Sequence, residues 1–119
     1  MTMTTETKYI LDGHEPKPCS DPLEWARWME ANKYAPRQLD PEGMDVCRVG
    51  STKVGNAWVS TVFLGVNYNF AEHGRPIVFE TMVFGGSLDN EQERYATWDE
   101  AETGHAAMVK RVSEKETKA

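Results

Sequence analysis

The stretch that decides the fold reads AWVSTVFLGVNYNFAEHGRPIVFETMVFGG and runs from Ala57 to Gly86. Two segments rich in β-branched and aromatic residues, 57–66 and 76–84, flank a polar connection at 67–75. Such segments favour β-strands, so most of the sheet and most of the core are expected here. The stretch contains no nucleophile elbow, phosphate-binding loop or metal-ligand pair, so it describes a scaffold and no chemistry.

A β-hairpin is predicted at the start of this stretch. Gly55-Asn56 separates the segments 46–54 and 57–66, and a two-residue turn of this type has positive φ at the glycine. Counting outward from the turn gives the expected cross-strand partners: Val54 with Ala57, Lys53 with Trp58, Val49 with Val62, and Cys47 with Leu64. The last two pairs place apolar side chains opposite each other, which favours this register. The pairing of Lys53 with Trp58 predicts a cation–π contact near the turn.

The third predicted strand, 76–84, has apolar side chains on both faces. A sheet with one hydrated face alternates apolar and polar residues, and this segment departs from that alternation. Both faces are therefore expected to be covered, either by helices on opposite sides of the sheet or by a partner.

Two helices are predicted from their capping residues. Asp21 is the expected N-cap of the first helix, and Pro22 occupies its first helical position. The apolar stripe of this helix is wider than one packing face needs, so one of its two tryptophans is expected to be partly exposed. Thr97 and Glu100 form a capping box for the second helix, whose apolar stripe ends near Val112.

The predicted fold class is α+β, with a three- to four-stranded, mainly antiparallel meander sheet and two packed helices. The 119-residue chain is expected to form one domain, 9–112, between flexible tails at 1–8 and 113–119. Residues 9–11 are expected as a short strand and 95–96 as a short edge strand. Residues 14–18 are expected as an extended connector, because each of the two prolines disfavours a helical residue before it.

Composition excludes several classes of protein. A net charge of −6 disfavours direct nucleic-acid binding, whose affinity depends on neutralising phosphates, and it suits a basic partner. Neither a signal peptide nor a stretch of transmembrane length is present, so a cytoplasmic location without membrane association is expected. Cys19 and Cys47 are too few for a disulfide framework and are expected as reduced thiols. The three histidines lack metal-ligand spacing, so neither a metal nor a cofactor is predicted.

The connection 67–75 concentrates amides, an aromatic ring, an imidazole and a guanidinium, which are groups that recognition loops use. It is either an ordered structural loop or a loop that binds a ligand or a protein. Glu80, within the following strand, either faces solvent or forms the polar floor of a pocket under the loop. The candidate binding residues are therefore Asn67, Tyr68, Asn69, His73, Arg75 and Glu80.

His105 lies in the middle of the apolar stripe of the second helix. It is expected as a core or boundary histidine that is hydrogen-bonded to a backbone carbonyl. A catalytic base would need a nucleophile or carboxylate converging on it, and the sequence indicates none, so no catalytic residue is predicted. Gly104 beside it is expected to allow close approach of the helix to the sheet.

Five strings resemble a family of small uncharacterised proteins that recurs in tailed-phage genomes and bacterial prophages. They are YILDGHEP, EWARW, VSTVFLGVNYNF, FETMVFGG and RYATWDEAETGHAAMV, and the resemblance spans about 9–112. The resemblance implies a small accessory protein in the cytoplasm of an infected or lysogenic host. It implies no activity and no catalytic residues.

These observations predict a non-enzymatic, acidic accessory protein that binds a host or phage protein. Its sharpest form is an inhibitor of a nucleic-acid-handling host enzyme. The alternative is a small-molecule or nucleotide binder, or a small enzyme, that uses the loop 67–75. Apolar area on two strand faces also predicts a homodimer as one way to cover a face left bare.

Overall fold

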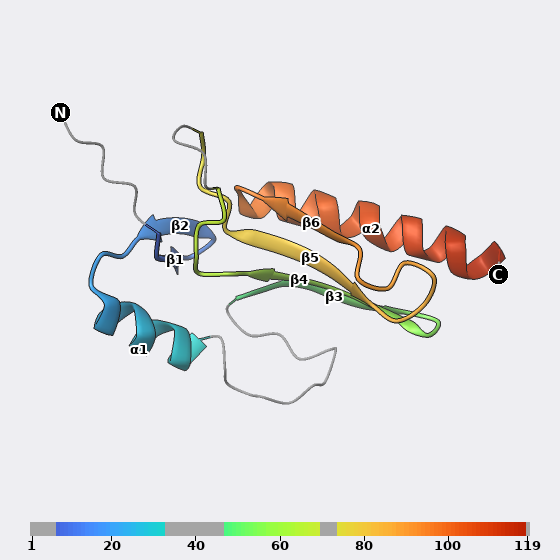
Figure 1. Cartoon of the computed structure of the whole chain (residues 1–119), viewed down its shortest axis with the longest axis horizontal. Coiled ribbons are helices and arrows are strands. Elements are labelled where there is room, and N and C mark those ends of the chain that lie inside the picture. Colours follow the sequence, from blue (N-terminus) through green and yellow to red (C-terminus); the bar gives the residue numbers. More distant parts are fainter. Residues whose placement is uncertain (1–6, 33–46, 70–73, 119) are drawn as a thin grey trace.

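The computed structural model describes residues 7–32, 47–69 and 74–118. It confirms the α+β class, with a two-stranded and a four-stranded antiparallel sheet and two helices (Figure 1). The elements in chain order are β1 (Tyr9–Asp12), β2 (Glu15–Pro18), α1 (Pro22–Asn32), β3 (Arg48–Val54), β4 (Ala57–Phe63), β5 (Phe79–Phe84), β6 (Gln92–Tyr95) and α2 (Trp98–Lys118).

The larger sheet is a meander in the order β3-β4-β5-β6. At the tip of the first hairpin the predicted register is confirmed, since Val54 pairs with Ala57 and Lys53 with Trp58. Gly55 has the positive φ, 57°, that the turn requires. Farther from the turn the predicted register is wrong. A β-bulge between Arg48 and Gly50 pairs Arg48 with Val62 and leaves Val49 as the extra residue, so neither predicted apolar pair forms.

One face of this sheet packs against α2, which contacts all four strands. The side chains at this contact alternate along β4 and β5, as a half-buried strand requires. Those that are fully buried include Val59, Thr61, Phe63, Phe79, Thr81 and Val83 on the sheet, and Ala101, Met108 and Val112 on the helix. The Thr97 hydroxyl accepts the Glu100 backbone N–H at 3.0 Å, which confirms the predicted cap. The helix continues to Lys118, beyond the end predicted at Val112.

At one end of the sheet lie α1 and the β1–β2 hairpin (Figure 1). Residues 15–18, expected as a connector, form a strand because the turn at Gly13 folds them back onto β1. Trp25 anchors α1, since its indole N–H donates to the Tyr9 and Gly65 carbonyls at 3.1 and 2.9 Å. Both tryptophans of α1 are half-buried, and Met29 is its buried residue.

Asp21 caps α1 as predicted, with its carboxylate accepting the Leu23 backbone N–H at 3.0 Å. Neither α1 nor α2 combines the length and the apolar character that crossing a bilayer needs. One face of the larger sheet carries no helix among the described residues. The reason is that α1 packs on β1, and α2 covers the other face of the larger sheet.

Candidate functional site

The sheet face that points away from α2 is called here the open face. The strand register arranges its side chains in three rows that cross the sheet. One row is Lys53, Trp58 and Phe84; the next is Ser51, Ser60, Met82 and Gln92; the third is Arg48, Val62, Glu80 and Arg94. Apolar, aromatic and cationic groups are thus interleaved on one surface.

Two aromatic rings form the apolar part of the open face near the β3–β4 turn. Trp58 and Phe84 lie on adjacent strands with ring centroids 5.2 Å apart and planes inclined by 32°. The Trp58 indole N–H donates to the Ser51 hydroxyl at 2.8 Å, which fixes the orientation of the ring. Phe84 is 44% exposed, which is unusual for a phenylalanine and makes it the most accessible ring of this surface.

Arg48 reaches from its own row toward this aromatic pair. Its Nη1 donates to the Ser60 hydroxyl at 2.9 Å, and its guanidinium carbon lies 5.6 Å from the Trp58 ring centroid. The cation–π partner of Trp58 is therefore Arg48, in place of the predicted Lys53. The Arg48 Nε is buried and has no hydrogen-bond acceptor. No ion pair joins Arg48 to a carboxylate among the described residues.

Two of the predicted site residues, Tyr68 and Glu80, meet around Arg94 at the other side of the open face. Arg94 Nε lies 3.0 Å from a Glu80 carboxylate oxygen, and its guanidinium carbon lies 4.7 Å from the Tyr68 ring centroid. The Glu80 side chain is 14% exposed, and its carboxylate is engaged by Arg94 and not freely solvated. One of the three cations of this face is thus neutralised within the fold.

Two of the remaining predicted site residues, Asn67 and Asn69, form hydrogen bonds with the backbone of the connection 67–75 and of Ile77 after it. The Asn67 side-chain oxygen accepts the backbone N–H groups of Asn69 and Ile77 at 2.8 and 2.9 Å, and Asn67 is buried. The Asn69 amide donates to the Arg75 carbonyl at 2.7 Å. These contacts support the structural interpretation of the loop. His73 lies outside the described residues.

Arg75 points toward the start of α2, where it forms an ion pair with Glu100 at 2.9 Å. The Ala96 backbone N–H and the Arg75 guanidinium both lower the pKa of Glu100. Arg75 is therefore separated from Tyr68 and Glu80, because it interacts with the helix and they line the open face. Of the five predicted residues that the structure describes, Tyr68 and Glu80 lie together on the open face.

His105 belongs to a polar network enclosed between α2 and the sheet. Its Nδ1 lies 2.7 Å from the Thr61 hydroxyl and its Nε2 lies 2.9 Å from the Thr52 hydroxyl, so threonines replace the predicted backbone carbonyl. The Thr61 and Thr81 hydroxyls are 2.5 Å apart, and the Tyr95 hydroxyl donates to Thr81 at 3.1 Å.

The network is kept neutral and tightly packed. Burial lowers the pKa of His105 and raises the pKa of Tyr95, so both side chains are neutral at pH 7. A Cβ at Gly50 would come within 2.8 Å of the imidazole, and a Cβ at Gly104 would collide with the Tyr95 ring. Both glycines therefore allow the close helix–sheet contact that was predicted for Gly104. Among the described residues, both ring nitrogens of His105 contact threonine hydroxyls.

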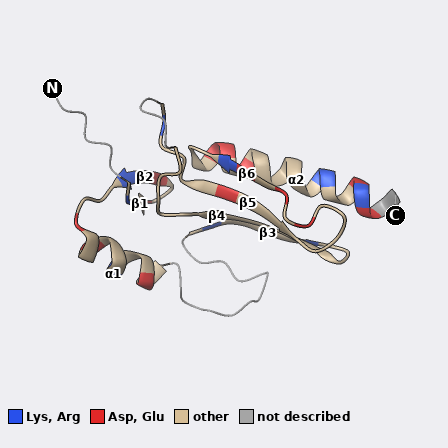
Figure 2. Cartoon of the chain, in the orientation of Figure 1, with Lys and Arg blue, Asp and Glu red and all other residues tan. Residues whose placement is uncertain are grey.

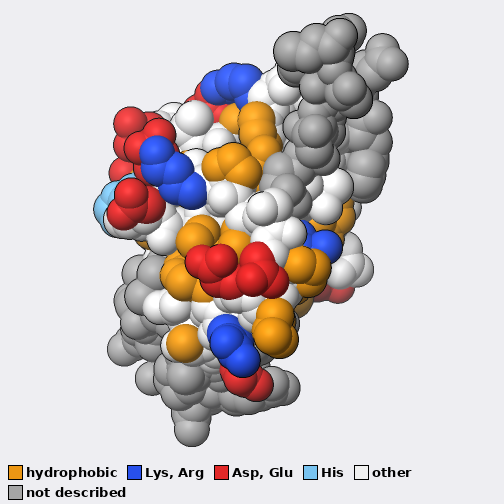
Figure 3. Space-filling model, turned by 90° about the vertical axis from the view of Figure 1, so that its left-hand side faces the viewer, with side chains coloured by type: hydrophobic (Ala, Val, Ile, Leu, Met, Phe, Trp, Pro, Cys, Tyr) orange, Lys and Arg blue, Asp and Glu red, His pale blue; other side chains and the backbone are white. Residues whose placement is uncertain are grey.

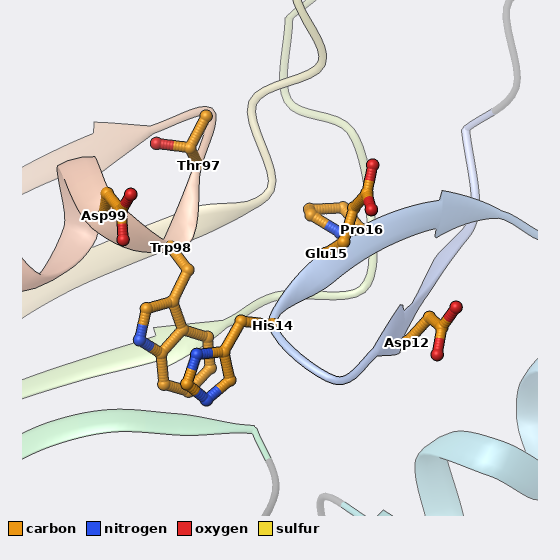
Figure 4. Close-up of a pocket in the computed structure, with 7 residues that line it drawn as sticks. All are labelled: Asp12, His14, Glu15, Pro16, Thr97, Trp98 and Asp99. Carbon is orange, nitrogen blue, oxygen red and sulfur yellow. The ribbon is translucent and has the colours of Figure 1, made fainter.

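A shallow hollow of about 350 Å³ lies between the β1–β2 hairpin and the start of α2. Its floor is a stacked pair, His14 on Trp98, with ring centroids 3.7 Å apart and planes inclined by 2°. The carboxylates of Asp12, Glu15 and Asp99 surround this pair without converging on one point (Figure 4). At this end of the molecule, hydrophobic and acidic groups alternate (Figure 3). No metal-binding group of three or more His, Cys, Asp or Glu occurs within 7–32, 47–69 and 74–118.

The open face is the surface where the structure gathers binding-type side chains, and five of them were not among the predicted site residues: Arg48, Trp58, Met82, Phe84 and Arg94. Comparison of the chain with protein-family models, with curated proteins and with solved structures found no match.

Proposed function

We propose that this chain is a non-enzymatic accessory protein that binds a protein partner through the open face of its sheet. The observation that carries the proposal is the composition of that face. Protein interfaces are enriched in aromatic residues, methionine and arginine, and tryptophan, tyrosine and arginine dominate their binding energy. The open face combines these types on adjacent strands: Arg48, Trp58, Tyr68, Met82, Phe84 and Arg94.

The rigidity of the open face also supports binding. Trp58 is fixed by Ser51, Arg48 by Ser60, and Arg94 by Glu80, all through hydrogen bonds between neighbouring strands. Side chains that are already ordered lose little conformational entropy when a partner docks. By contrast, His105, the residue suited to general-base chemistry, is enclosed in a network of hydroxyl groups.

The small-molecule alternative depended on the loop 67–75 presenting its polar groups to a ligand. Among the described residues of that loop, the amides of Asn67 and Asn69 bind the loop's own backbone, and Arg75 pairs with Glu100. These groups are engaged within the fold, so the protein-binding proposal is better supported.

The resemblance to phage and prophage proteins supports a partner from the host or the phage. The net charge of the chain is −6, and the acidic side chains of its described part lie on both helices and the N-cap of α1, on β1, β2, β5 and β6, and between β5 and β6 (Figure 2). The open face itself carries three cations, Arg48, Lys53 and Arg94, against one carboxylate, Glu80. Docking there does not use the acidic surface that an inhibitor of a basic enzyme would need, so that form of the proposal is less well supported.

Site-specific crosslinking tests the proposal. A photoreactive phenylalanine analogue at position 84 should crosslink a partner in bacterial cells that express the protein. The same analogue at position 107, which is exposed on α2, is the matched control and should not crosslink that partner. Crosslinking of the same protein from position 107 alone would move the binding surface to α2. A crosslink between two copies through position 84 would identify the open face as a homodimer interface.

A further inference from the structure

We propose that the open face recognises an acidic segment of its partner, and that the Arg48 guanidinium is the group that binds a partner carboxylate. This inference rests on the proposed function and adds the chemistry of the ligand. Its starting point is the state of Arg48: half-buried, oriented by Ser60 and stacked on Trp58.

The Arg48 side chain is held in place by Ser60 and Trp58, but it has no anionic partner among the described residues. A guanidinium offers five N–H donors in a planar fork that matches a carboxylate with two parallel hydrogen bonds. One nitrogen, Nη1, donates to Ser60, and the Nε–H is shielded from water without an acceptor. Shielding a donor without an acceptor is unfavourable, so an arriving carboxylate would satisfy it with a small movement of the side chain.

The charges around Arg48 favour an anion at this place. Lys53 lies at the end of the row that contains Trp58, is exposed, and pairs with no described carboxylate. Glu80, the acidic residue of the face, is engaged by Arg94. Two cations on the β3 side of the open face are therefore unneutralised within the described chain, which attracts a negatively charged partner to a protein that is acidic overall.

The apolar surface beside Arg48 defines what should accompany the carboxylate. The guanidinium lies over Trp58, and Trp58 packs on the exposed ring of Phe84. A segment that places an aspartate or glutamate next to an aromatic or aliphatic side chain would contact the cation and the rings together. Burial of the rings would also exclude water from the ion pair and strengthen it.

The same groups fit a single-stranded nucleic acid less well. Base stacking needs free aromatic faces, whereas Arg48 lies over Trp58 and Arg94 lies over Tyr68. The net charge of −6 also opposes a polyanion that carries one charge per nucleotide. An acidic segment of a protein, folded or extended, presents fewer charges than a nucleic acid does, and it is the partner that fits these groups better.

Selection from a library of random displayed peptides, with the intact protein as bait, tests this inference. We expect the selected peptides to be enriched in Asp and Glu next to aromatic or aliphatic residues. A selected peptide, made synthetically, should lose more than about tenfold in affinity for the Arg48→Gln variant and should bind more weakly as salt is raised. Arg111→Gln is the matched control, because Arg111 pairs with Glu91 away from the open face, and it should leave the affinity unchanged.

The other possible outcomes show whether the acidic-segment proposal fails alone or the proposed binding through the open face fails as well. Neutral or basic peptides that lose affinity for Phe84→Ser but keep it for Arg48→Gln would overturn the acidic chemistry and leave the open face as the binding surface. Peptides indifferent to both variants, or no binders at all, would overturn the proposed function as well. Tighter binding of a fluorescent oligothymidylate than of any selected peptide would replace the protein partner with nucleic acid. Circular dichroism and the melting temperature of each variant test whether the fold is retained.

Discussion

Replacement of Thr61 by valine tests the hydrogen-bonded network between α2 and the sheet. Thr61 is fully buried, and its hydroxyl contacts both His105 Nδ1 and the Thr81 hydroxyl. Valine has nearly the same shape and suits a strand, so the change removes hydrogen bonds while leaving the packing almost unaltered. The result reports on the polar contacts alone.

The expected loss follows from the groups left without partners. His105 Nδ1 loses its neighbour completely, whereas Thr81 retains the hydrogen bond from Tyr95. A buried polar group without a partner costs about 1–3 kcal/mol, and a hydrogen bond lost from a group that keeps another costs about 1 kcal/mol. Thr61→Val should therefore lower the free energy of unfolding by about 2–4 kcal/mol, a large part of the stability of a domain of this size.

Urea denaturation followed by tryptophan fluorescence and circular dichroism measures this loss. Thr103→Val is the matched control, because it makes the same change of side chain at an exposed position on α2. The control should shift the free energy of unfolding by less than about 0.5 kcal/mol. If Thr61→Val shifts it no more than the control does, the network contributes nothing and the reasoning is refuted.

Three further predictions concern other contacts. Burial lowers the pKa of His105, which faces the hydroxyls of Thr52 and Thr61, so folding favours the neutral form of its ring. The contribution of His105 to the free energy of unfolding should be constant above about pH 6.5, the pKa in the unfolded chain. Below that pH the contribution should fall until the pKa of the folded state is reached. Denaturant midpoints across this range should show that slope, and His105→Gln should remove its share of it. Asn67→Ala should lower the free energy of unfolding by about 2–4 kcal/mol, because the backbone N–H groups of Asn69 and Ile77 lose their acceptor; a melting temperature equal to that of the wild type would contradict it. Trp98→Ala should cost about 3 kcal/mol, toward the lower end for a large aromatic residue because Trp98 is half-buried between His14 and Phe79; a loss below about 1 kcal/mol in denaturant melts would mean that α2 does not depend on this contact.

Local sequence signals predicted the parts of the fold that local interactions determine. The Gly55-Asn56 turn fixes the hairpin tip, and the Asp21 and Thr97 caps fix the starts of both helices, because each depends on residues within a few positions. The apolar side chains on both faces of 76–84 led to the prediction that both sheet faces are covered, either by helices on opposite sides or by a partner. The structure places α1 at the end of the sheet and leaves the open face without a described helix.

The position of the candidate binding residue Arg48 on the open face could not be predicted, because the bulge reverses the face on which Arg48 lies. In the register expected from the turn, Arg48 lies opposite Phe63, and Phe63 points toward α2. The extra residue, Val49, moves Arg48 opposite Val62 and therefore onto the open face. This shift depends on contacts distant in sequence, such as that of His105 with Gly50, which strand patterns do not contain.

The network around His105 can order its hydroxyl hydrogens in one direction. Each hydroxyl has one hydrogen to donate, and Tyr95 gives its own to Thr81. For one tautomer of the ring, Thr81 donates to Thr61 and Thr61 donates to the imidazole Nδ1. The neutral ring then carries its proton on Nε2 and donates it to Thr52. Adding a second proton to the ring would turn Thr61 from donor to acceptor. Ionisation of His105 would thus reverse the orientation of hydroxyl groups on three strands, as far as the half-exposed Tyr95 on β6.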